Sequence, residues 1–254
     1  IKLPVIQNGY RNGTVTDCGD GMNPDMEKII DLHPDAILLS PFENSGGYGR
    51  VEKLNLPFIE SAEYMETSAF GRAEWLRCYG LLFGVVSKAD SLFAEVDSCY
   101  NQLRKRASLS SSSLSVVSEL KSGSAWYVPG GCSTIGRLFN DACGRYAFAE
   151  DKHSGSIPLA FETVFDKAGD ADVWTIKYNR DRDMTYSDLK ADYIGYTGFK
   201  AFKTRNIYGC NTAKVPFYEE TPFRPDYLLS DLIQILHPEI GDLGGLRYFC
   251  KLNE

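Results

Sequence analysis

Two carboxylates occupy equivalent positions of a repeated stretch. The stretch MEKIIDLHPDAILLSP, residues 26–41, has a near-echo in FETVFDKAGDADVWTIK, residues 161–177. A gapless alignment places Glu27 on Glu162. The same alignment matches Ile30 with Phe165, Asp31 with Asp166 and Asp35 with Asp170. Paired carboxylates can act in a shared site, or each can form an ion pair with a basic partner.

A second group of residues, candidates for ligand binding, lies in loops at or just after predicted strands. In open α/β sheets these loops line the ligand crevice, and aromatic-rich edges suit a bulky, partly apolar ligand with polar decoration. Solvated loop acids and aromatic packing between lobes are the alternative explanation. The candidate ligand contacts are Phe42, Glu43, Tyr48, Trp126, Tyr127, Tyr178 and Tyr218.

The compact motifs of metal, nucleotide and nucleophile sites are absent from the sequence. None of the seven cysteines lies in a CxxC pair, which disfavours a zinc or iron–sulfur site. The sequence has no GxGxxG, GxxxxGK[ST] or GxSxG. His33 and His237 each precede a proline, so we expect them on the surface at helix ends, and His153 in a loop. We therefore expect no catalytic residue, no metal ligand and no cofactor.

Charge and hydropathy narrow the function classes. The net charge of −7 argues against nucleic-acid binding, because phosphate binding needs a basic face. No apolar run approaches the roughly 20 residues of a membrane span. The chain begins with Ile1, so we expect that a preceding segment, such as a signal peptide, has been removed.

Helical and strand patterns alternate on both sides of one long predicted helix. Asn23 is the expected N-cap of the first repeated helix, with Pro24 at its first position. The apolar run in PDAILLS predicts a strand buried on both faces of a parallel sheet. The polar run 108–115 separates the long helix from the second half of the chain.

This pattern predicts an α/β protein with two Rossmann-like lobes joined by a single long backbone helix. The N-terminal lobe is expected at residues 1–86, the connecting helix at 87–107 and the C-terminal lobe at 108–254.

An ordered set of segments resembles one family of binding proteins. NPDMEKIIDLHPDAILLS, LNLPFIESAEYMETSAFGRAEWLRCYGLLFG and KADSLFAEVDSCY are similar to the first lobe and connecting helix of helical-backbone ABC-transporter substrate-binding proteins. GCSTIGRLFNDACG, IPLAFETVFDKAGDADVW, FKAFKTRNIYGCN and RPDYLLSDLIQILHPE are similar to their second lobe, in the same order. The group includes binding proteins for ferric siderophores, haem and cobalamin.

The resemblance implies a monomeric protein, without catalysis, that holds an iron chelate or tetrapyrrole-like ligand between its lobes. It also implies a periplasmic or cell-surface location, a lipid anchor and delivery to a membrane permease. The family's docking acids match Glu27 in MEKI and Glu162 in FETV. Both acids also suit the positive ends of their helices, and the two explanations are compatible.

The sequence departs from the family at its start, and other function classes stay open. Family members begin with a further strand–helix unit that residues 1–14 do not show, so the first lobe is either a fragment or reduced. The alternatives are a two-lobed Rossmann-like enzyme, such as a glycosyltransferase or nitrogenase-like oxidoreductase, and a sensory binding protein without transport. Such an enzyme needs a nucleotide-phosphate loop or cluster-binding cysteines, and neither pattern is visible.

Overall fold

The computed structural model describes residues 1, 3–20, 23–40, 49 and 51–254. It divides into two compact units, Ile1–Met65 and Glu66–Glu254. We call them unit 1 and unit 2. The three-part division at residues 86 and 107 stays a prediction, and the expected long helix is present as α4 (Val86–Ser108).

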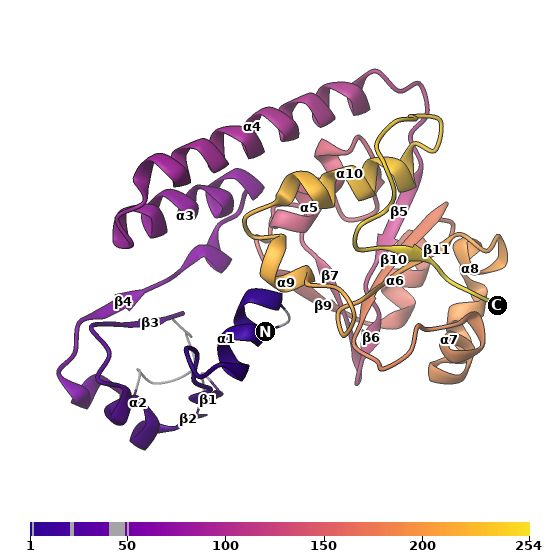
Figure 1. Cartoon of the computed structure of the whole chain (residues 1–254). Helices are drawn as coiled ribbons and strands as arrows, with labels where there is room; N and C mark the ends of the chain where they lie inside the picture. Colours follow the sequence, from indigo (N-terminus) through magenta and orange to yellow (C-terminus); the bar gives the residue numbers. More distant parts are fainter. Residues whose placement is uncertain (2, 21–22, 41–48, 50) are drawn as a thin grey trace. The chain divides into compact units, whose positions relative to one another are not determined.

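Unit 1 is built from short elements (Figure 1). Its helices are α1 (Pro4–Arg11) and α2 (Met26–Leu32), with 3-10 turns η1 (Val51–Leu54) and η2 (Glu63–Met65). Strands β1 (Gly19–Asp20) and β2 (Asn23–Pro24) pair antiparallel. Strands β3 (Ile37–Leu39) and β4 (Phe58–Glu60) pair parallel.

Two sequence-based expectations for unit 1 are wrong. The N-cap of α2 is Asp25, whose carboxylate accepts a hydrogen bond from the Lys28 backbone N–H at 3.2 Å. Asn23 and Pro24 cannot start the helix because they form β2. The strand expected to be buried on both faces has a single described partner, β4, and Leu38 at its centre is 37% exposed.

Unit 2 begins with a pair of long helices, α3 (Ala69–Leu82) and α4, which lie side by side (Figure 1). The helices approach closely where Gly80 faces Ala89, since a side chain at Gly80 would collide with the Ala89 methyl group. The last helix, α10 (Pro225–Leu236), packs against α4 and also against α5 (Thr134–Asp141).

A five-stranded sheet forms the centre of unit 2, in the order β12-β11-β10-β5-β8. Strands β5 (Ser115–Ser118), β8 (Arg145–Tyr146), β10 (Val173–Tyr178) and β11 (Ile207–Asn211) are parallel, and β12 (Cys250–Lys251) joins one edge antiparallel. A separate antiparallel sheet contains β6 (Lys121–Ser122), β7 (Ala125–Pro129) and β9 (Ser156–Leu159). The remaining helices are α6 (Phe161–Ala168), α7 (Tyr186–Asp192), η3 (Ile194–Gly198), α8 (Lys200–Lys203) and α9 (Phe217–Glu220).

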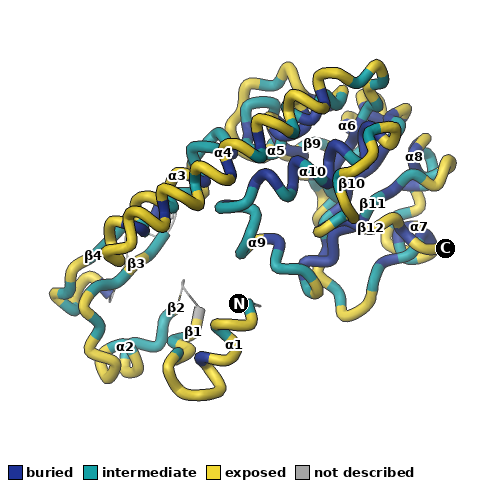
Figure 2. Tube along the Cα trace, turned by 45° about the horizontal axis from the view of Figure 1, so that its top comes forward, coloured by how far each residue is buried: buried dark blue, intermediate teal, exposed yellow. Residues whose placement is uncertain are grey.

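The two faces of β10 have different neighbours. Thr175 and Lys177 line one pocket with side chains of α5 and α10. On the other face, Trp174 lies against Trp126, with ring centres 5.5 Å apart, and against Tyr196 and Phe199. This aromatic cluster and α10 both contribute fully buried side chains to the core of unit 2, and buried residues appear dark blue in Figure 2. The predicted α/β fold class is therefore confirmed.

Candidate functional site

The carboxyl edge of the five-stranded sheet gathers polar side chains from successive strands. Strands β5, β10 and β11 are parallel, so their carboxyl ends at Ser118, Tyr178 and Asn211 meet at one edge. In open α/β sheets this edge is where ligands bind. The residues that occupy it are thus the first candidates for a binding site in unit 2.

An ion pair between Glu119 and Lys177 lies at this edge. Both side chains are about one-fifth exposed, and the Lys177 ammonium also lies 5.6 Å from the centre of the Phe217 ring. Burial lowers the pKa of Lys177, but the Glu119 charge and hydrogen bond outweigh burial, so the pKa is raised and the side chain stays protonated. The pair places one fixed positive and one fixed negative group beside the strand ends.

A small pocket opens beside the Glu119–Lys177 pair. Its walls combine the hydroxyls of Ser118 and Thr175 with apolar side chains from α5, α9, α10 and the C-terminal segment. The apolar lining residues are Ile135, Phe139, Phe217, Leu228, Leu232 and Phe249. An apolar pocket with a few polar groups is the usual composition of a small-molecule site.

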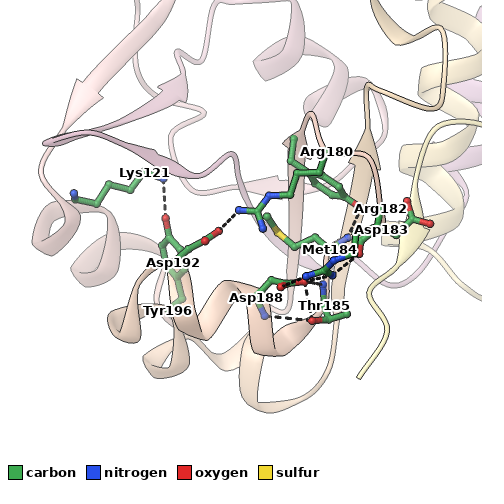
Figure 3. Close-up of polar contacts among 10 residues, drawn as sticks. Lys121, Arg180, Arg182, Asp183, Met184, Thr185, Asp188, Asp192 and Tyr196 are labelled. Carbon is green, nitrogen blue, oxygen red and sulfur yellow. Dashed lines mark hydrogen bonds and ion pairs between the residues drawn. The ribbon is translucent and has the colours of Figure 1, made fainter.

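The loop after β10 holds two arginines, and both are paired with acids of α7 (Figure 3). Arg180 Nη2 lies 2.6 Å from Asp192 Oδ2. Arg182 donates two hydrogen bonds to Asp188, at 2.7 and 2.6 Å, and these lower the pKa of that carboxyl. The arginines therefore brace this loop against α7.

Asn211 holds the same loop from β11, and Thr185 holds it from the start of α7, where Figure 3 shows it beside Asp188. The Asn211 amide donates to the Arg180 carbonyl oxygen at 2.8 Å. Thr185 and Asp188 form a capping box at the start of α7. These contacts fix the edge of the sheet at the place where a ligand would meet it.

The predicted ligand contacts divide into exposed and buried residues. Tyr127 on β7 is 49% exposed and Tyr218 on α9 is 65% exposed. Trp126 is fully buried, and its indole N–H donates to the Ser118 carbonyl oxygen at 3.0 Å. Tyr178 is buried too, and its hydroxyl accepts a hydrogen bond from the Met184 backbone N–H at 3.1 Å. Trp126 and Tyr178 are therefore core residues. Their burial corrects the prediction that they contact a ligand.

The alternation of a strand explains why neighbouring aromatics have different roles. Successive side chains of β7 point to opposite faces, so Trp126 enters the core and Tyr127 faces outward. Phe42, Glu43 and Tyr48 lie outside the described residues. Glu119 and Lys177 were not among the site residues predicted from the sequence. Each stands near the carboxyl end of a predicted strand, where ligands bind in open α/β sheets, so the same rule could have found them.

The two candidate docking acids are exposed in their own units. Glu27 lies in the first turn of α2, and Glu162 lies in the first turn of α6. An acid in the first turn is stabilised by the helix dipole. The positions of Glu27 and Glu162 are thus compatible both with docking to a permease and with stabilisation of their helices.

The histidines differ in burial from each other. His33 is exposed and ends α2 in a left-handed conformation, as expected for a surface residue. His237 is fully buried, with Nε2 2.7 Å from the Ala142 carbonyl oxygen, so its predicted surface position is wrong. The end of α10 packs beneath the residues that follow α5, and the LHP pattern carries no sign of that contact.

Within the described part of the chain, no three His, Cys, Asp or Glu side chains form a cluster suited to a metal ion. The seven cysteines are free thiols. No helix in the described ranges is both long and apolar enough to cross a membrane.

Comparison with known families identifies the class of protein. Residues 3–213 match the periplasmic binding protein family model, so this chain belongs to that family.

Curated relatives are similar along almost the whole chain. An uncharacterised lipoprotein of Methanocaldococcus jannaschii is 27% identical over 98% of this chain and 59% of its own length. A second lipoprotein of the same organism is 25% identical over 99% of this chain and 65% of its own length. This chain therefore spans less than two-thirds of the length of either relative.

Solved structures share the fold at low sequence identity. A periplasmic haem-binding protein from Pseudomonas aeruginosa gives a TM-score of 0.72 at 14% identity, covering 97% of this chain and 88% of that chain. An ABC-transporter substrate-binding protein from Listeria monocytogenes gives 0.71 at 18% identity, covering 94% and 88%. The haem complex of IsdE from S. aureus gives 0.68 at 18% identity, covering 90% and 86%.

Proposed function

We propose that this chain is the substrate-binding component of an ABC importer. It captures an iron chelate, haem or a cobalamin-like ligand and delivers it to a membrane permease. The observation that carries the proposal is the family match over residues 3–213, supported by neighbours whose names specify haem binding. The names of the first two relatives support a lipid-anchored protein in the periplasm or at the cell surface.

The ligand contacts that we propose in unit 2 are Tyr127 and Tyr218. Both offer exposed phenol rings, which can stack on a planar ligand or donate a hydrogen bond to a chelate oxygen. The Glu119–Lys177 pair and the apolar pocket beside it supply charge and apolar surface at the carboxyl edge of the five-stranded sheet. Phe42, Glu43 and Tyr48 remain proposed contacts on sequence grounds alone.

The docking points that we propose are Glu27 on unit 1 and Glu162 on unit 2, each facing basic residues of the permease. Two charged contacts on separate units restrict the orientation of docking as well as adding attraction. An exposed ion pair contributes little to affinity by itself, so the value of the pair lies in orientation and in the rate of association.

A fluorescence titration tests the ligand class. The chain is titrated with haem, cobalamin and ferric siderophores, and quenching of its tyrosine and tryptophan emission is followed. We expect saturable quenching by one of these ligands, and an affinity at least tenfold lower in Tyr218→Ala or Tyr127→Ala. Phe83→Ala is the control, because Phe83 is an exposed aromatic (71%) at the end of α3. Saturable binding of none of the three ligands would contradict the ligand class.

A charge-reversal experiment tests docking separately. Glu27→Lys combined with Glu162→Lys is expected to abolish permease-dependent uptake while ligand affinity is kept. Asp35→Lys combined with Glu150→Lys is the matched control, because both residues are exposed and the net charge changes equally. Loss of ligand affinity in the Glu27/Glu162 variant would show that these acids serve the ligand and not the permease.

A further inference from the structure

We propose that each docking point is a set of three residues and not a lone glutamate. In unit 1 the set is Glu27, Ile30 and Asp31. In unit 2 it is Glu162, Phe165 and Asp166. Each set presents an apolar side chain flanked by two acids, and its partner is the permease, with an apolar recess bordered by arginine or lysine. This inference rests on the proposed function and specifies the chemistry of its docking surface.

The three residues of each set share one side of a helix. Residues at positions i, i+3 and i+4 of a helix lie next to one another on its surface. Glu27, Ile30 and Asp31 have this spacing on α2, and all three are exposed. The corresponding residues of α6 are also exposed. Each unit therefore offers one surface that combines negative charge with apolar area.

The exposed apolar surface of the second residue in each pair is the feature that packing within the unit does not explain. Each helix has two adjacent apolar positions, Ile29 and Ile30 in α2 and Val164 and Phe165 in α6. Val164 is fully buried and Ile29 is half-buried, so packing accounts for the first position of each pair. Ile30 is 51% exposed and Phe165 is 39% exposed.

A single exposed apolar side chain is ordinary and needs no explanation. Here the exposed apolar residue recurs at the same offset from the same glutamate in both compact units. Its type changes between Ile30 and Phe165, but its apolar character and its exposure are kept. Glutamate before it and aspartate after it are identical in the two helices.

Phe165 is held in place by its neighbours while part of its ring stays exposed. It stacks on Phe161, with ring centres 5.8 Å apart and planes 13° apart, and contacts Phe199 edge-on at 5.1 Å. Gly198 allows this arrangement, because a Cβ atom there would lie 2.8 Å from the Phe165 ring. A ring ordered before binding loses little conformational entropy on docking.

The surrounding acids determine what kind of partner fits. An apolar contact surrounded by charged residues has the anatomy of a protein interface, with an apolar centre and a polar rim. Acids on this rim require basic residues opposite them, since like charges across an interface are strongly unfavourable. A bilayer with an anionic surface would be repelled by both sets, so a basic protein surface is the partner that matches.

The test measures affinity for the ABC permease–ATPase complex of the same organism, reconstituted in lipid nanodiscs. Ile30→Gln is expected to weaken binding about tenfold, because an interface contact is lost while the helix keeps its fold. Leu32→Gln is the matched control, since Leu32 is 49% exposed on the same helix but two positions further on. We expect its affinity to match that of the unaltered chain.

The second unit is tested in the same way. Phe165→Gln is expected to weaken binding at least as much, and Phe165→Leu to restore most of the affinity because it remains apolar. Leu109→Gln is the control, since Leu109 is 78% exposed. Melting curves of the Phe165 variants separate lost docking from lost folding, and Ile30→Gln gives the answer even where a Phe165 variant unfolds, because α2 has no buried residue.

The outcomes distinguish docking through the three-residue sets from docking through the acids alone. Unchanged affinity in Ile30→Gln, with binding lost in Glu27→Lys plus Glu162→Lys, overturns the three-residue set and leaves acid docking intact. Equal weakening by Leu32→Gln also overturns the set, because the loss would then follow apolar area anywhere on α2. Failure of the unaltered chain to bind the complex overturns the docking role itself, whatever the ligand titration shows.

Discussion

The same helix–strand sequence occurs in both units, but it is buried in only one of them. In unit 2, α6 leads to β10, where Val173, Trp174 and Ile176 are fully buried. In unit 1, α2 leads to β3, where Leu38 is 37% exposed, and α2 has no buried residue. Similar sequence thus produces similar local structure, while burial depends on the elements around it.

The two strands also differ in the number of strands that pair with them. Strand β10 pairs with β5 on one side and β11 on the other, and both are parallel to it. Among the described residues, β3 pairs only with β4. A parallel strand is normally covered on both faces, so unit 1 leaves apolar surface open that unit 2 covers. We therefore expect the two units to respond very differently to equivalent substitutions.

The largest expected effect is the loss of a core aromatic in unit 2. Trp126→Ala removes a fully buried side chain and its hydrogen bond to Ser118, so it should lower the free energy of unfolding by about 3–5 kcal/mol. Denaturant unfolding followed by far-UV circular dichroism measures this change.

Leu38→Ala tests a strand residue of unit 1, at the position that the repeat alignment pairs with the fully buried Val173 of β10. Because Leu38 is already 37% exposed, the expected loss is about 1 kcal/mol or less. If Leu38→Ala is as damaging as Trp126→Ala, the contrast between the two units is wrong and β3 belongs to a core.

The next effect concerns an ion-pair network around Asp172 in unit 2. Asp172 precedes β10, and its carboxylate accepts hydrogen bonds from Lys200 Nζ at 2.6 Å and from the Ser115 backbone and hydroxyl at 2.9 and 2.7 Å. Burial opposes ionisation, but these contacts outweigh burial and lower the pKa of Asp172 to about 2, from an ordinary value of 3.8.

This shift gives a pH dependence with a definite sign. Since the folded pKa is below the unfolded one, the contribution is present above pH 3.8 and is lost as the pH falls through 2. With allowance for solvent screening, Asp172→Asn should lower the free energy of unfolding by about 1–2 kcal/mol at neutral pH. The difference between this variant and the unaltered chain should shrink in acid. Asp170→Asn, at an exposed position two residues earlier, is the control, and an undiminished difference at low pH would contradict the assignment.

These contrasts also show what the sequence could predict. Hydrophobic periodicity located α4 and the helix–strand repeat, because local spacing determines both. Sequence patterns predicted both Trp126 and Tyr127 as ligand contacts. The orientation of β7 shows that Trp126 belongs to the core and Tyr127 to the surface. His237 and the Glu119–Lys177 pair depend on contacts between residues 95 and 58 positions apart, which local patterns do not contain.

A smaller effect comes from the unequal caps of the two repeated helices. Asp25 caps α2 with its side chain, whereas Ala160 at the head of α6 has no side chain that can do so. Ala160 already has the extended backbone of an N-cap, with φ −69° and ψ 152°. Ala160→Ser should therefore raise the free energy of unfolding by about 0.5–1 kcal/mol, or the melting temperature by about 1–4 °C. Ala160→Val adds no acceptor and should show no such gain.

The smallest expected effect is the loss of the Asp25 cap, and it should be confined to unit 1. Asp25→Ala leaves the Lys28 backbone N–H without its acceptor, so α2 should fray and its amides should exchange with solvent faster. Asp25→Asn keeps the cap and removes the charge, which separates the hydrogen bond from the effect of charge on the helix dipole. Hydrogen exchange resolves α2 from unit 2, where amide protection in α10 should not change. Faster exchange in α10 would mean that the head of α2 supports the large core, contrary to the weak coupling expected of a helix with no buried residue.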